Sequence, residues 1–180
     1  MIERLRCGEP AALEQVYAEE KAGIYGFLLR LSGDRHCAAD LFQNVWLKLA
    51  RHAAALRPDS NVRAWLYTVA RREYLSLRRA QALDLSRVLV LGLEPRDAPA
   101  DAAADGDLAA LKAGLDRLGE ADREVLLLSV AEGLEARAAA EILGISTVAL
   151  RQRLARARRR LARLLEAADA SGSRLSRGVR

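Results

Sequence analysis

The stretch from Gly144 to Leu165, GISTVALRQRLARARRRLARLL, constrains the fold of this chain more than any other feature. Seven arginines and no acidic residue lie between Arg151 and Arg163. Leucines at 150, 154, 161, 164 and 165 recur at mixed steps of three and four residues, which predicts one amphipathic helix. The chain must therefore provide a core for the apolar face of this helix and a partner for its basic face.

The composition favours helices almost throughout. Hydrophobic residues make up 51% of the 180 residues, mainly as Ala and Leu, while aromatic residues make up only 4%. This length suits one large or two small domains. A net charge of +5 is too modest to indicate a nucleic-acid partner, so the concentration of arginines in one helix is the better indication.

A segment rich in acids and proline divides the chain. Residues 94–107 hold five acids, two prolines and one arginine, a composition typical of a flexible, solvated linker. We expect helices over 10–32, 36–56, 61–80, 107–117, 120–132 and 136–143, and a long helix from 147. The predicted fold is all-α, with two helical domains at 1–93 and 108–167, the linker at 94–107 and a disordered basic tail at 168–180.

The segment 83–93, LDLSRVLVLGL, is too apolar for a linker. Packing within its own domain is the favoured interpretation, and docking to another protein is the alternative.

The spacing around Gly144 predicts a helix-turn-helix. Gly144 lies where the turn between two crossed helices needs a positive φ, and Ser146 can cap the following helix. The small core is closed by Ile142, Ile145, Leu150 and Leu154. In this motif the second helix enters the major groove of DNA, where Arg pairs with guanine and Gln with adenine. The alternative is a helical hairpin with a solvated basic face.

A second pattern lies on the helix expected at 61–80. Arginines and tyrosines alternate on one face, at positions Arg63, Tyr67, Arg71, Tyr74 and Arg78. Arginines that follow phosphates and rings that stack on bases suit single-stranded nucleic acid. An ordinary amphipathic helix, with arginine stems lying along apolar surface, explains the pattern equally well. Both interpretations stay open, although a duplex-binding and a single-strand-binding element in one chain would together suit promoter opening.

At this point the sequence resembles the extracytoplasmic-function sigma factors, a two-domain branch of the bacterial sigma superfamily. DLFQNVWLKL resembles the polymerase-binding helix, and VRAWLYTVARREYLSLRR the helix that melts and recognises the minus-ten element. The segment from LDRLGEADREVLLL through the arginine helix resembles the domain that recognises the minus-thirty-five element. The resemblance implies a sigma factor that directs promoter-specific transcription initiation, without enzymatic activity or a cofactor.

The resemblance also implies three sets of site residues. Contacts to the minus-thirty-five duplex are expected from Ser146, Thr147, Arg151, Gln152, Ala155 and Arg156. Contacts to the minus-ten single strand are expected from Asn61, Arg63, Tyr67, Arg71, Arg72, Tyr74, Arg78 and Arg79. Polymerase contacts are expected from Asp40, Leu41, Gln43, Asn44, Trp46, Leu47 and Lys48. The later arginines at 158, 159, 160 and 163 would meet phosphates or polymerase.

The implied partners are the clamp and flap of the bacterial RNA polymerase core, promoter DNA and an anti-sigma factor. The free protein is expected to be a monomer. The sequence departs from the family pattern where the polymerase-binding helix usually reads Asp-Ala-Glu-Asp-Leu-x-Gln-Glu. Here Cys37, Ala39 and Asn44 replace three of the four acids, and only Asp40 remains. Fewer carboxylates would weaken charge pairing with a basic clamp surface, which suggests an extra partner or a modification.

Further departures affect both domains. Ala139 stands where a larger aliphatic residue is usual, and Glu135 where a Ser or Thr cap is usual, so we expect an underfilled core and a weak cap. In the first domain, Ser76 replaces a common Asp and Arg72 a common Asn.

Other classes of function are disfavoured. Cys7 and Cys37 form no disulfide framework and no zinc spacing, and a metal site around His36 and Cys37 would lack a second cluster of ligands. The charged N-terminus does not resemble a signal peptide, and the longest apolar run, at 88–93, is too short to span a membrane. We therefore expect a cytoplasmic protein without a metal. The remaining alternative is a sigma-like DNA-binding regulator that binds core polymerase weakly.

Overall fold

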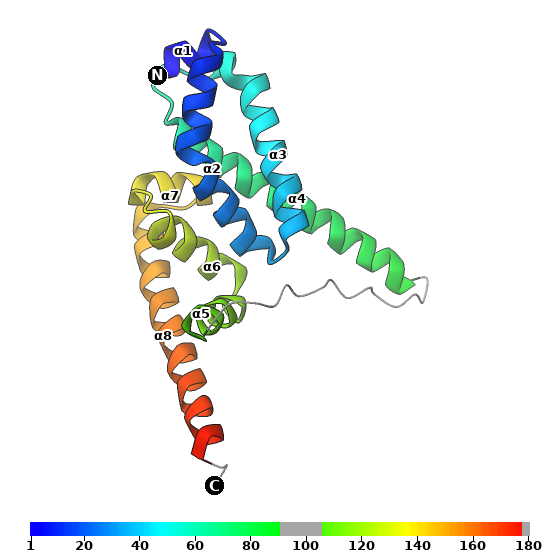
Figure 1. Ribbon diagram of the computed structural model, residues 1–180, viewed down its shortest axis with the longest axis vertical. Coiled ribbons are helices and arrows are strands. Elements are labelled where there is room, and N and C mark those ends of the chain that lie inside the picture. The colour runs from blue at the N-terminus through cyan, green and yellow to red at the C-terminus, as the bar shows by residue number, and fades with distance from the viewer. Residues whose placement is uncertain (91–105, 178–180) are drawn as a thin grey trace. The chain divides into compact units, whose positions relative to one another are not determined.

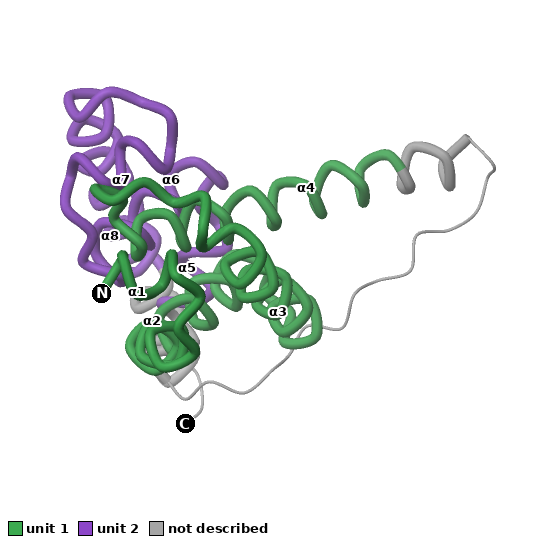
Figure 2. Tube along the Cα trace, turned by 90° about the horizontal axis from the view of Figure 1, so that it is seen from above, with its two compact units in different colours: residues 1–101 green, residues 102–180 purple. Residues whose placement is uncertain are grey.

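The computed structural model describes the backbone of residues 1–90 and 106–177, and the side chains of residues 1–83 and 111–167. Every regular element in these ranges is helical (Figure 1). The chain divides into two compact units, residues 1–101 and 102–180, which Figure 2 draws in separate colours. The predicted all-α, two-domain fold is confirmed, and each unit is described by itself.

Over residues 1–90, unit 1 contains four α-helices and one short 3₁₀ turn. In chain order these are α1 (Ile2–Arg6), α2 (Pro10–Ser32), α3 (Arg35–His52), η1 (Ala53–Ala55) and α4 (Val62–Val90). The helix α1 was not predicted from the sequence, and α4 extends ten residues beyond the expected end at residue 80. The apolar segment 83–93 therefore begins as part of α4, while its side chains after residue 83 lie outside the described residues.

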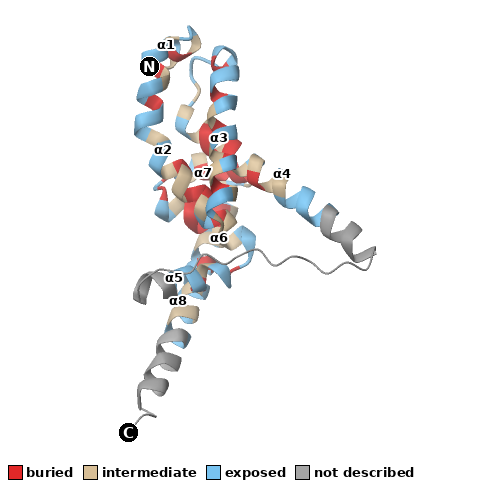
Figure 3. Ribbon diagram, turned by 45° about the vertical axis from the view of Figure 1, so that its right-hand side comes forward, coloured by how far each residue is buried: buried red, intermediate tan, exposed pale blue. Residues whose placement is uncertain are grey.

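The core of unit 1 lies where α2, α3 and α4 meet. In α2 the buried residues Ile24, Phe27, Leu28 and Leu31 follow the three- and four-residue steps of a helix. Val45 and Leu49 of α3 and Leu66 of α4 are also buried, and the three helices contact one another. Figure 3 colours the buried residues of the ribbon red.

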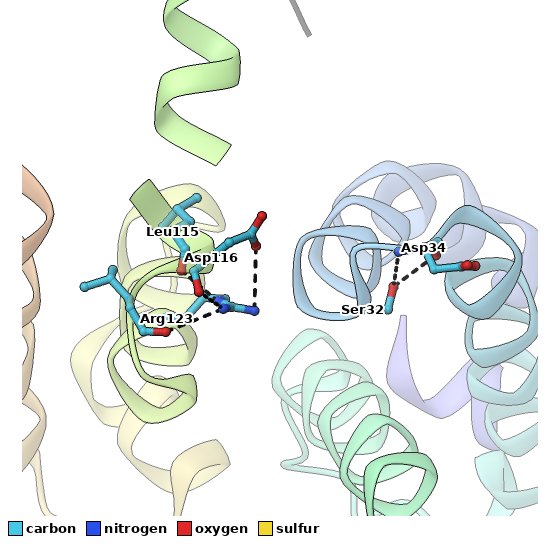
Figure 4. A network of polar contacts seen from close by, with 6 residues as sticks. Ser32, Asp34, Leu115, Asp116 and Arg123 are labelled. Atoms are coloured by element: carbon cyan, nitrogen blue, oxygen red, sulfur yellow. Dashed lines mark hydrogen bonds and ion pairs between the residues drawn. The ribbon is translucent and has the colours of Figure 1, made fainter. Parts of the chain in front are cut away.

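A tight connection sets the angle between α2 and α3. Gly33 ends α2 in the left-handed conformation, with φ of 70°, and Asp34 caps α3 by accepting a hydrogen bond from the amide of Cys37 at 2.7 Å. The hydroxyl of Ser32 donates to the carbonyl of Asp34 at 3.0 Å (Figure 4). Backbone geometry and short-range hydrogen bonds therefore define this connection.

Unit 2 contains α5 (Gly106–Asp116), α6 (Glu120–Leu126), a π-helical turn η2 (Leu127–Ala131), α7 (Ala136–Leu143) and α8 (Thr147–Arg177). Leu118, Leu126 and Ala157 are buried together, with leucines of α5 and α8 packed around them. The guanidinium of Arg123 on α6 donates from Nε to the carbonyl of Leu115 and from Nη2 to that of Asp116, both at 2.9 Å (Figure 4). These carbonyls close α5, so a cation stabilises the negative end of that helix dipole.

The predicted linker and the predicted C-terminal tail have different outcomes. Most of the expected linker, residues 94–105, lies outside the described residues. The structure also differs from the predicted disordered tail at 168–180, because α8 continues as a helix to Arg177. Once a long helix exists, each further residue adds a hydrogen bond without a new nucleation cost, so a Ser- and Gly-containing sequence can extend it.

Candidate nucleic-acid and polymerase interfaces

The turn between α7 and α8 has the geometry that the sequence predicts. Gly144 ends α7 with φ of 67°, a left-handed conformation that costs glycine nothing. The hydroxyl oxygen of Ser146 accepts a hydrogen bond from the amide of Ala149 at 3.1 Å, which confirms the predicted cap. Ile142 and Leu150 are buried on either side of the turn. No side-chain hydrogen bond caps α7 at Glu135, as its departure from the usual Ser or Thr suggests.

The first three turns of α8 expose the residues predicted for duplex contacts. Leu150 and Ala157 are buried and Leu154 is half-buried, so the opposite side of the helix faces away from the core. Most of the predicted set is exposed, and only Thr147 is half-buried; the exposed members are Ser146, Arg151, Gln152, Ala155 and Arg156. Arg151 and Arg156 are five residues, or about 140°, apart around the helix, so they flank Gln152 and Ala155.

The later arginines of α8 border a hollow beside α6. This hollow has a volume of about 890 Å³, and its lining includes Arg156, Arg159, Arg160 and Arg163 together with Asp122 of α6. The Asp122 carboxylate lies 4.0 Å from Nη1 of Arg160. With Arg153, five guanidinium groups line this hollow against two carboxylates, those of Asp122 and Glu166, and this excess of positive charge makes the side of α8 attractive to phosphate oxygens.

The stacking role predicted for two tyrosines of α4 is wrong. Tyr67 is 0% and Tyr74 is 5% exposed, so neither ring offers a face on which a base can stack. Residues seven apart lie on the same side of a helix, and this side faces α2: the Tyr67 ring meets that of Phe27 edge to face, with centroids 5.3 Å apart. The alternation of Arg and Tyr comes from arginine stems that border a buried aromatic stripe.

The arginines of α4 fall into two groups. Arg63 forms an ion pair with Glu20 of α2 at 3.3 Å and lies 5.9 Å from the centre of the Tyr67 ring, and Arg71 is half-buried with an interaction partner of its own. Arg72, Arg78 and Arg79 are exposed, as is Arg63 despite its ion pair. Arg72 and Arg79 are seven residues apart on one face, which makes this face the better candidate for contact with a polyanion.

Asn61 lies at the start of α4 and acts as its cap. The side-chain oxygen of Asn61 accepts a hydrogen bond from the amide of Ala64 at 3.0 Å. A hollow of about 220 Å³ lies beside it, and Arg63 and Ile2 of α1 are also part of its wall.

The polymerase-binding residues predicted on α3 are only partly available. Leu41 is 5% exposed and packs in the core, so its prediction as a contact residue is wrong; its position four residues before Val45 puts it on the buried side. Asp40, Gln43, Asn44 and Leu47 are exposed. Lys48 is exposed but pairs with Glu73 of α4. Trp46 is half-buried, and its ring contacts Tyr17 of α2 with centroids 4.8 Å apart.

Among the side chains that the structure describes, no three His, Cys, Asp or Glu residues gather closely enough to hold a metal ion. Within the same residues, no helix is long and apolar enough to cross a membrane.

One exposed residue of α8 was not predicted from the sequence as a site residue. Val148, in the first turn, is 59% exposed and lies four residues before Gln152 on the same face. An apolar residue beside a leucine-rich helix is naturally assigned to the core. Val148 precedes the buried Leu150 by two residues, a step that turns about 200° around a helix, and this spacing indicates that Val148 points outward.

Comparison with known proteins identifies both units. Residues 16–83 match the model of Sigma-70 region 2, and residues 108–161 match that of Sigma-70 region 4. Over 147 residues the chain is 31% identical to the ECF RNA polymerase sigma factor EcfG of Rhodopseudomonas palustris. The matched region spans 79% of this chain and 78% of EcfG. The chain belongs to the family of ECF RNA polymerase sigma factors. It is also 30% identical over 171 residues to the sigma factor CarQ of Myxococcus xanthus, covering 91% and 95% of the two chains.

Solved structures of sigma factors have the same fold. This sigma factor matches RpoE of Bartonella quintana, solved in complex with the anti-sigma factor NepR, with a TM-score of 0.75, 28% identity and coverage of 85% and 96%. It matches CnrH, solved with the cytosolic domain of CnrY, with a TM-score of 0.70, 24% identity and coverage of 92% and 95%. Sigma factors are not enzymes, so the surfaces described above are candidates for binding rather than catalysis.

Proposed function

We propose that this sigma factor recognises the minus-thirty-five element through the exposed face of α8. The observation that carries the proposal is the helix-turn-helix geometry of α7 and α8, with Arg151, Gln152 and Arg156 exposed directly after the Ser146 cap. Arg and Gln are the side chains that pair with guanine and adenine edges in the major groove. The hollow beside Asp122 supplies arginines for the neighbouring phosphates.

Unit 1 contacts the minus-ten element in this proposal, through a smaller set of residues than the sequence suggested. Arg72, Arg78 and Arg79 are exposed on α4, and the amide of Asn61 lies at its start. Arg63 and Arg71 are engaged within the unit, so they would have to exchange partners to meet DNA. The buried tyrosines support α4 from behind and do not touch nucleic acid.

The α3 surface binds the polymerase clamp in this proposal. Gln43, Asn44 and Leu47 are exposed around Asp40, which is the single acid of α3. The flap is the expected partner of unit 2. Binding of core polymerase and promoter DNA requires a cytoplasmic protein, which we propose as its location.

A sigma-like regulator with weak core binding is the second candidate. It is favoured by the charge of α3, where Arg35, Lys48 and Arg51 outnumber Asp40. A basic helix would pair poorly with a basic clamp surface. Co-purification of core polymerase with the full chain separates the two candidates, because only the sigma factor retains the core subunits at physiological salt.

An anti-sigma factor is a further proposed partner. The support is the likeness to RpoE, which was solved in complex with one at 28% identity to this chain. Binding of both units by such a partner would block promoter recognition.

Run-off transcription tests the main proposal. Core RNA polymerase is combined with the full chain and promoter DNA, beginning with the DNA upstream of its own gene. A discrete transcript that requires the chain is expected. Stable binding to core without any promoter-dependent transcript would contradict the proposal.

A further inference from the structure

Val148 is the most exposed large apolar side chain on α8 among the described residues, and packing within unit 2 does not account for it. It is 59% exposed, whereas Leu150 two residues later is 1% exposed. A step of two residues turns about 200° around a helix, so the side that buries Leu150 turns Val148 outward.

Val148 begins a stripe of exposed residues along α8. Gln152, Ala155 and Arg159 follow at steps of four, three and four residues, and all are exposed. The first three members of this stripe are uncharged. Arg151 lies on one side of the stripe and Arg156 on the other, so a neutral, partly apolar centre is flanked by two guanidinium groups.

This arrangement fits the chemistry of the major groove at an A·T pair. Guanine offers two acceptors to arginine and adenine pairs with Gln, but Val can form no hydrogen bond with a base edge. The apolar group that the major groove presents is the C5-methyl of thymine. Val is β-branched and has one strongly preferred χ1 rotamer in a helix, so its methyl groups are held in place before DNA arrives.

We propose that Val148 is a specificity-determining residue that contacts the C5-methyl group of a thymine in the minus-thirty-five duplex. The inference rests on the proposed function of α8 and adds to it the identity of one base. The contact excludes water from two apolar groups and favours thymine over the other bases at one position. The arginines that flank the stripe would anchor the helix on the DNA. Val148, at the N-terminal end of the stripe, would favour thymine at one base pair.

Uracil provides the matched chemical probe, because it pairs like thymine and lacks only the C5-methyl group. Promoter fragments randomised in the upstream duplex are first selected with the full chain bound to core RNA polymerase. Each thymine of the selected element is then replaced by uracil, and dissociation constants are measured by fluorescence anisotropy. Val148→Ala is compared with wild type. Val130→Ala is the matched control, since Val130 is 53% exposed in the same unit but lies outside α8.

Wild-type protein should lose about fourfold in affinity when uracil replaces thymine at one position, the effect expected for one methyl group taken from an apolar contact. Val148→Ala should bind the thymine duplex less tightly and show no further loss with uracil there. Val130→Ala should behave as wild type. If Val148→Ala keeps the full preference for thymine over uracil, the proposed contact between Val148 and the thymine methyl group is refuted. Duplex recognition by α8 would not be affected by that result. Failure of the wild-type holoenzyme to select any element overturns the proposed function as well.

Discussion

The rings of Phe27 on α2 and Tyr67 on α4 meet edge to face, with their centroids 5.3 Å apart and their planes inclined at 73°. Edge-to-face contact of two buried rings adds to the free energy gained from their burial. This pair joins α2, which contributes much of the core of unit 1, to α4, the helix proposed to contact the minus-ten element. The buried tyrosine of α4 therefore stabilises the proposed DNA-binding surface from within.

Tyr67→Ala should lower the free energy of unfolding of unit 1 by about 3–5 kcal/mol, because it removes a fully buried ring and leaves a cavity. Urea unfolding followed by the fluorescence of Trp46 and Trp65 measures this loss. Tyr17→Ala is the control, since Tyr17 is 40% exposed and should cost much less. A Tyr67→Ala protein of wild-type stability that fails only in promoter melting would restore the stacking role.

Arg72→Ala and Arg79→Ala should each weaken promoter binding across all sequences. Each lost phosphate contact should also reduce the salt dependence, by about 0.7–0.9 units of the log–log slope. Gel shifts of the holoenzyme over a series of salt concentrations measure the slope. Arg57→Ala is the control, because Arg57 is exposed but paired with Asp59 at 3.0 Å. Unchanged slopes in both α4 variants would exclude this face from DNA contact.

Arg151→Ala and Arg159→Ala should have different effects on DNA binding. Arg151 lies beside the exposed stripe near the start of α8, so its loss should cost about 1–3 kcal/mol and relax the preference at one or two bases. Arg159 lies two turns further on and lines the hollow beside α6, so its loss should weaken all sequences alike. Binding to a panel of single-base variants distinguishes the two effects. Equal, sequence-independent losses would argue against base recognition by Arg151.

Ala39→Glu combined with Asn44→Glu should strengthen binding to core polymerase. The two substitutions restore carboxylates at positions where the family usually has them, and Asn44 is exposed while Ala39 is half-buried. Exposed ion pairs contribute about 0.2–1 kcal/mol each, so the gain should be small and should shrink with salt. Pull-down titration with core at low and high salt measures it. Ala11→Glu with Ala18→Glu on α2 adds the same charge elsewhere, and an equal gain there would show a nonspecific effect.

Cys37 should react slowly with iodoacetamide at pH 8. Partial burial raises the pKa of its thiol above the ordinary value, and the thiolate is the reactive form. A raised pKa in the folded state means that the thiol form is favoured by folding. The resulting contribution to folding stability is fully present below the ordinary thiol pKa. It is lost as the pH rises through the raised pKa of the folded state. Mass spectrometry should find Cys7, which is exposed, alkylated first. Faster labelling of Cys37 would contradict its described surroundings.

Local sequence determined the features that depend on neighbouring residues. The positive φ of Gly144, the Ser146 cap and the helix that follows are all consequences of short-range backbone geometry and hydrogen bonding. The three- and four-residue spacing also predicted Leu150 as a core residue. These features require no knowledge of what the helices pack against, so they could be read from the chain.

The tertiary structure decided which side of each helix is free. Tyr67 and Arg63 are neighbours on one face of α4, yet packing against α2 buries the ring and pairs the guanidinium with Glu20, a residue 43 positions away in the chain. A tyrosine suits a core and a surface equally well, because its ring is apolar and its hydroxyl is polar. Periodicity shows that residues share a face, but only the position of the neighbouring helix determines whether that face meets protein or water. The same reason separates Leu41, which is buried, from Val148, which is exposed.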